Sequence, residues 1–100
     1  MLVHTVLFWL RKDLQEDQLA QFQAGLEKLK AIKSANIIYI GSPAKTGPRP
    51  EVIVDSYDFC LTVIFETIEA HDAYQVDPIH KEFIETFSSY WEKVRVYDAD

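Results

Sequence analysis

The sequence predicts an α+β fold in which one four-stranded antiparallel sheet carries helices on a single face. Three observations predict it: four apolar segments with strand character, helical segments between them, and the order in which the two kinds alternate along the chain. The chain has 100 residues, of which 48% are hydrophobic and 26% are charged. This length and composition suit a single globular domain over residues 1–100 with one modest core.

The first strand is predicted over residues 2–10, because this stretch is rich in β-forming residues. Successive side chains of a strand point to opposite faces of the sheet. One face would carry Val3, Thr5, Leu7 and Trp9, and the other would carry His4, Val6 and Phe8. Both faces are therefore largely apolar.

A helix follows the first strand. Asp13 is a candidate N-cap, since Glu16 stands three residues later in the register of a capping box. Apolar residues recur at helical spacing up to about Ile32. These are Leu19, Phe22, Leu26 and Leu29. A short apolar run over 36–40 is then predicted to be the second strand.

The segment 41–56 contains three of the four prolines and two of the three glycines, so it is a long connection. Within it, Val52, Ile53 and Val54 are too apolar to stay free. We expect them to pack on another surface, such as a second subunit.

The second half of the chain repeats the alternation. The third strand is predicted over 57–65, and Thr67 can cap a helix that runs through Tyr74. Asp77 and Pro78 restart a helix, as N-cap and first helical residue. Its inner stripe would be Ile79, Phe83, Phe87 and Tyr90, and the last strand would span 94–97. The order β-α-β-β-α-β is the ferredoxin-like pattern.

The first and third strands are apolar on both faces, while helices can cover only one. A large bare apolar face is unusual on a soluble monomer. The simplest cover is a second copy of the same sheet, so we predict a homodimer that closes into a dimeric α/β barrel. The alternative is a monomer whose 41–56 loop folds over the sheet.

Charge and composition exclude several partners. The net charge is −6 and no basic stretch exists, which disfavours nucleic acid and membrane surfaces. No apolar run approaches the roughly 20 residues that span a bilayer. The single cysteine, Cys60, lies in an apolar run and is expected to be a buried hydrophobe. A cytoplasmic location is the expectation.

Few motifs in this chain carry chemistry. There is no glycine-rich phosphate loop and no Cys/His spacing for zinc, so neither a cofactor nor a metal is predicted. His80 would lie in the first turn of a helix, where the helix dipole favours the neutral imidazole needed for a general base. Asp77 would favour the charged form instead. Tyr74 can orient His80 or polarise a carbonyl, and His4 would be a polar group in an apolar wall that needs a partner.

Purely structural roles are the alternative for these residues. A first-turn histidine often bonds only the backbone, and a strand histidine is often a satisfied core residue. His71, flanked by Glu69 and Asp72, is expected to be solvated helix surface without a function.

Four segments together resemble the stress-responsive dimeric α/β barrel (Dabb) domain family. They are residues 3–8, the segment Tyr57-Asp58-Phe59, the pattern Tyr74-x-x-x-Pro78-x-His80 and the closing Val94-x-Val96-x-Asp98. The resemblance covers essentially the whole chain. It implies a ferredoxin-like protomer and a dimer through the sheets. The family includes stress-associated proteins of unknown activity and plant olivetolic acid cyclase, a cofactor-free enzyme that closes a polyketide by aldol chemistry.

The resemblance to that cyclase implies site residues. The base would be His80, Tyr74 would assist it, and His4 would line the site. Together with strand parity, the resemblance places the pocket between helices and sheet. Its lining would be Val6, Phe8, Phe22, Leu61, Phe83, Val94 and Val96. Two positions depart from the pattern: Asp77 stands where the family commonly has histidine, and Leu26 stands where the cyclase has a pocket tyrosine.

Three functions follow from this reading. The first is a cofactor-free lyase- or cyclase-like enzyme that uses His80 and Tyr74 to remove a proton from a small, polyketide-like carbonyl compound. The second is a non-catalytic stress-response protein that binds a small apolar or phenolic ligand. The third is a dimerising interaction protein whose pocket is filled by its own side chains, such as Phe8, Phe22 and Phe83.

Overall fold

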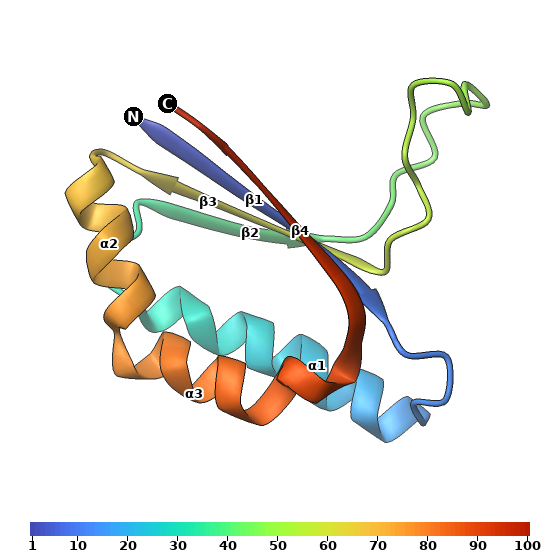
Figure 1. Ribbon diagram of the computed structural model, residues 1–100, viewed down its shortest axis with the longest axis horizontal. Helices are drawn as coiled ribbons and strands as arrows, with labels where there is room; N and C mark the ends of the chain where they lie inside the picture. The colour runs from blue at the N-terminus through green and yellow to red at the C-terminus, as the bar shows by residue number, and fades with distance from the viewer.

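The computed structural model describes residues 1–100 and has the predicted ferredoxin-like architecture (Figure 1). One four-stranded sheet has the spatial order β2-β3-β1-β4, and all three pairings are antiparallel. The strands are β1 (Leu2–Leu10), β2 (Ile37–Gly41), β3 (Phe59–Phe65) and β4 (Trp91–Ala99). The helices are α1 (Glu16–Lys28), α2 (Ile68–Val76) and α3 (Pro78–Phe87), with 3₁₀ turns η1 (Leu29–Ala31) and η2 (Ser88–Tyr90).

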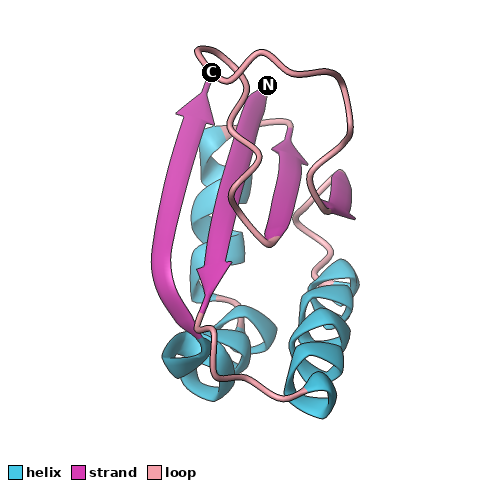
Figure 2. Cartoon of the chain, turned by 90° about the vertical axis from the view of Figure 1, so that its right-hand side faces the viewer, coloured by secondary structure: helices cyan, strands magenta, loops and turns pink.

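The helices lie together on one face of the sheet (Figure 1). The long loop between β2 and β3 stands away from the helices in Figure 1, and in Figure 2 it runs in front of the strands. In this loop Val52 and Val54 stay exposed. None of the helices is both long and apolar enough to cross a membrane.

Local signals define most element ends. The Thr67 hydroxyl accepts a hydrogen bond from the Ala70 amide, and the Asp77 carboxylate accepts one from the Ile79 amide at 2.8 Å, as predicted for both caps. Pro78 opens α3 as its first residue. The break at Asp77 divides the second helical segment into α2 and α3.

The predicted cap of α1 is wrong. Gln15 occupies the N-cap, and its backbone N–H donates a hydrogen bond to Oε1 of Gln18 at 2.8 Å. The Asp13 carboxylate instead pairs with the Arg11 guanidinium at 3.2 Å. The last strand is also longer than the predicted 94–97, because β4 pairs with β1 along almost its whole length.

The core fills the space between the sheet and the helices. Alternate residues of β1 are buried, as the period-two pattern predicts. The centre is Phe22 of α1, which is fully buried, with its ring 5.3 Å from that of Phe8 and 5.6 Å from that of Phe87. Beside it, Gly25 lets α1 and α3 approach, because a Cβ there would lie 2.3 Å from the Phe87 ring.

No helix covers the opposite face of the sheet, where the chain's own loop reaches only Trp9, through Ser56 and Tyr57. Val3, Leu7 and Ile64 on the central strands are only partly buried, and Tyr39 at the edge is 66% exposed. An apolar face of this kind needs a partner surface.

We expect Gly25→Ala to destabilise the fold by about 1–3 kcal/mol, since the added methyl group overlaps the Phe87 ring. Helix propensity alone would predict that this substitution stabilises the fold, because alanine favours a helix more than glycine does. Urea unfolding measures the change, with Gln23→Ala on the exposed side of α1 as control. Equal or greater stability of the Gly25 variant would contradict the close packing.

We expect the protein to sediment as a dimer and Leu7→Asp to shift it towards monomer, because a carboxylate on a central strand would be desolvated between two sheets. Analytical ultracentrifugation measures this. Leu19→Asp, at an exposed position of α1, is the matched control and should leave the mass of the sedimenting species unchanged. A wild-type monomer would overturn the expectation.

Candidate functional site

A cavity of about 200 Å³ lies between the sheet and helices α2 and α3. Ten of its thirteen lining residues are hydrophobic, so it suits a small and mainly apolar molecule. The lining residues are His4, Val6, Phe8, Leu29, Leu61, Tyr74, Gln75, His80, Phe83, Ile84, Trp91, Val94 and Val96.

Six of the seven expected apolar lining positions surround this cavity, and Phe22 does not. The Phe22 side chain lies in the aromatic core behind Phe8 and has no exposed surface. Sequence reasoning missed the lining residues Leu29, Gln75, Ile84 and Trp91. Of these, Ile84 follows the cavity residue His80 by four positions, a helical spacing that would have indicated it.

Tyr74 lines the cavity and carries an unusual polar group. Only 1% of its surface is exposed, and its hydroxyl is buried without a hydrogen-bond partner. Burial raises the pKa of Tyr74, so the hydroxyl keeps its proton and acts as a hydrogen-bond donor. A buried hydroxyl without a partner costs free energy that a bound ligand would recover.

His80 lies beside this hydroxyl-bearing ring. The centroids of the Tyr74 and His80 rings are 4.8 Å apart, although six residues separate them in sequence. Burial is the main cause that lowers the pKa of His80, and the neighbouring His4 lowers it further. Asp77 acts in the opposite direction but does not reverse the shift. The imidazole is therefore neutral near pH 7 and can accept a proton.

His4 has the partner that its apolar surroundings require. The residue is 4% exposed, and its Nδ1 lies 2.5 Å from a carboxylate oxygen of Asp98 on β4. The two residues face each other because His4 and Asp98 are paired in the β1–β4 register. Tyr74 packs beside them, with its ring centroid 6.1 Å from that of His4.

His71 is not the solvated surface residue that the sequence suggests. Its side chain is only 19% exposed, and its ring lies 5.2 Å from that of His4 and 5.5 Å from that of Phe65. His71 precedes Tyr74 by three residues, which places both on the face of α2 that meets the sheet. The sequence predicted an exposed His71 because the charged residues Glu69 and Asp72 flank it, whereas the three-residue spacing to Tyr74 indicated the buried face.

The whole-chain comparison decides the family. The model of the stress responsive A/B barrel domain matches residues 2–100. The chain belongs to the Dabb family. No curated protein matches this Dabb chain in sequence.

Solved structures share the fold of this Dabb protein at low sequence identity. A hydroxynitrile lyase from Passiflora edulis is 21% identical with a TM-score of 0.80, over 98% of this chain and 90% of the lyase. A Dabb protein with a ferredoxin-like fold from Mesorhizobium loti is 22% identical with a TM-score of 0.78, over 99% and 94%. A dimeric ferredoxin-like protein of unknown function from Thermobifida fusca is 20% identical with a TM-score of 0.78, over 98% and 88%.

The lowered pKa of His80 gives a stability prediction. Below about pH 6.5 the unfolded chain binds a proton at His80 that the folded chain binds only at lower pH. The free energy of unfolding should therefore fall as pH drops from about 6.5 towards the lowered pKa. The groups that act on His80 are His4, His71 and Asp77, with a backbone hydrogen bond at Gln75.

The measurement is the urea midpoint of wild type and His80→Asn between about pH 7 and pH 5. The loss of stability on acidification should be smaller in the variant. Lys81→Gln, the exposed neighbour, is the control and should follow wild type. An identical loss in His80→Asn would contradict the burial effect.

Proposed function

We propose that this Dabb protein binds a small, mainly apolar carbonyl compound in the cavity and removes a proton from the carbon beside the carbonyl group. The observation that carries the proposal is the buried, unpartnered Tyr74 hydroxyl beside the neutral His80 imidazole. A hydrogen-bond donor next to a base matches what enolisation requires.

The proposed step moves one proton. Tyr74 donates a hydrogen bond to the carbonyl oxygen, and a ring nitrogen of His80 takes the proton from the adjacent carbon. The electrons of the broken C–H bond form a C=C bond, and negative charge develops on the oxygen that faces Tyr74. The enolate then attacks a second carbonyl carbon of the same molecule, as in a cyclase, and the alkoxide formed from that carbonyl takes the proton back from His80. Without such an attack, the enolate carbon regains the proton from His80. His4 would position the substrate from the end of the cavity, held by Asp98.

The family and its neighbours support a lyase- or cyclase-like activity. The resemblance to olivetolic acid cyclase implies the same roles for His80, Tyr74 and His4, and the structural neighbour from Passiflora edulis is a hydroxynitrile lyase. The substrate differs in this proposal. Leu26, at the position of the cyclase pocket tyrosine, is fully buried in the core and does not line the cavity.

The proposed assembly is a homodimer that buries the bare faces of the two sheets. Its support is the partly buried apolar face of β1 and β3 and the dimeric state named for the Thermobifida fusca relative. Exposed Val52 and Val54 in the long loop would gain cover in the same assembly.

Ligand binding without chemistry is the second candidate, favoured by the apolar character of the cavity. In that case Tyr74 and His80 would serve only as hydrogen-bonding groups for an apolar or phenolic ligand. The open cavity argues against the third hypothesis, a pocket filled by the chain's own phenylalanines.

The test is deuterium exchange at the methyl group of acetophenone in D₂O, followed by NMR. We expect wild type to accelerate exchange. His80→Asn should lower the rate about 10²–10⁴-fold, the usual contribution of a positioned base. Tyr74→Phe should lower it about 10²-fold or more through loss of the oxygen-stabilising donor. Tyr90→Phe, whose hydroxyl lies outside the cavity, is the matched control.

Two outcomes would contradict enzymatic proton removal. The first is equal exchange by wild type and His80→Asn. The second is binding of acetophenone, seen as NMR shift changes, with no exchange; this outcome would favour the binding protein. Native mass spectrometry of protein purified without added ligand complements the test by reporting the subunit count and any retained molecule.

A further inference from the structure

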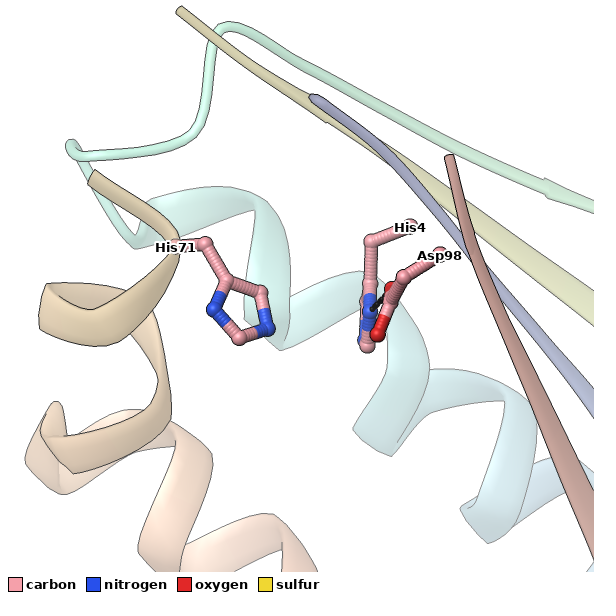
Figure 3. A group of neighbouring side chains, drawn as sticks. All are labelled: His4, His71 and Asp98. Atoms are coloured by element: carbon pink, nitrogen blue, oxygen red, sulfur yellow. Dashed lines mark hydrogen bonds and ion pairs between the residues drawn. The ribbon is translucent and has the colours of Figure 1, made fainter. Parts of the chain in front are cut away.

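Three potential metal ligands from three elements meet at the edge of the fold. They are His4 of β1, His71 of α2 and Asp98 of β4, and Figure 3 shows their side chains turned towards one another. One ligand atom from each lies within 4.8 Å of the other two. We propose that these residues form a binding site for one divalent first-row transition metal ion, with Zn²⁺ as the reference ion.

The donor set indicates this class of metal. Two imidazoles and one carboxylate suit zinc and its first-row neighbours, whereas calcium and magnesium prefer oxygen ligands alone. Three protein ligands also leave a coordination position for water or another small molecule. The sequence did not indicate this group of ligands, because residues 4, 71 and 98 lie far apart in the chain and form no local motif.

The hydrogen bond to Asp72 orients His71 as a ligand, whereas Gln75 holds the ring nitrogen that a metal would use. The Nδ1 of His71 lies 3.1 Å from a carboxylate oxygen of Asp72 and its Nε2 lies 3.3 Å from the side-chain nitrogen of Gln75. The amide nitrogen can only donate, so Nε2 carries the lone pair and Nδ1 carries the proton. Metal binding would replace the hydrogen bond from Gln75 at this Nε2 lone pair. A carboxylate on the second ring nitrogen is the usual support of a metal-bound histidine.

The site can form with small movements and is open to solvent. Ligand atoms on a tetrahedral zinc ion lie roughly 3.4 Å apart, so closing the 4.8 Å cluster needs a shift of about 1–1.5 Å. A neutral imidazole carries its one proton on either ring nitrogen, so His4 can turn a lone pair towards the ion and keep that proton. Asp98 is 45% exposed, which gives an ion a path to the buried His4.

The competing explanation is a purely structural cluster, in which His4 and Asp98 satisfy only each other. That explanation gives no reason for the second histidine, which sits beside the pair with its own carboxylate. The site shares His4 with the proposed enolisation, but the reacting groups of that step, His80 and the Tyr74 hydroxyl, are not among the ligands.

The experiment is calorimetric titration of chelator-treated, exhaustively dialysed protein with ZnCl₂, and optical titration with CoCl₂. We expect one ion per chain and a Co²⁺ spectrum with the intense visible bands of a four- or five-coordinate ion. His71→Leu and Asp98→Asn should each weaken Zn²⁺ binding at least about tenfold, and Asp72→Asn should weaken it about tenfold. His80→Asn removes another of the three histidines and should keep full binding.

Any one of four results would overturn the site. With wild type, these are the absence of stoichiometric Zn²⁺ binding and a Co²⁺ spectrum like that of the hydrated ion. With the variants, they are an unchanged Zn²⁺ affinity in folded His71→Leu and a loss of affinity in His80→Asn equal to that in His71→Leu. Circular dichroism confirms folding of each variant, and the wild-type Co²⁺ spectrum decides the question even if a variant fails to fold. Because metal binding is the readout, failure of the site and failure of the proposed enzyme remain distinguishable.

Discussion

The alternation of side chains along β1 is the constraint on which the rest of the structure depends. It turns Val6 and Phe8 towards the helices, where the Phe22 ring packs on Phe8. The same alternation forces His4 into this apolar layer. A shift of one residue in the β1 register would move the core, the cavity wall and the buried histidine to the bare face together.

Burial of polar groups then determines the chemistry of the site. His4 has a neighbouring carboxylate because Asp98 is its cross-strand partner. Tyr74 has no such partner, and its buried hydroxyl remains unsatisfied. His80 is only partly buried, which lowers its pKa without removing it from ligand access. One layer of the fold therefore holds an imidazole paired with a carboxylate, a hydroxyl without an acceptor and a second imidazole that is neutral near pH 7.

The helix break at Asp77 and Pro78 brings the side chains of Tyr74 and His80 together. In a continuous helix, residues six apart lie about 9 Å apart along the axis and about 120° apart around it. Here Tyr74 lies near the C-terminus of α2, His80 lies in the first turn of α3, and their rings are 4.8 Å apart. A capping aspartate and an N1 proline thus act as structural determinants of the site, not only of helix ends.

The sequence by itself determined the element order, the caps at Thr67 and Asp77 and the two apolar faces of the sheet, because these depend on local periodicity and on backbone chemistry. It also indicated His80, Tyr74 and His4 through a resemblance to the Dabb family. It failed at Asp13, where an acidic residue satisfied the local pattern but paired with Arg11 instead. Only the tertiary structure decided that Phe22 belongs to the core, that an open cavity exists, and that His71 lies against His4 and Asp98. Those outcomes depend on side-chain packing between elements far apart in the chain, which periodicity along one element does not encode.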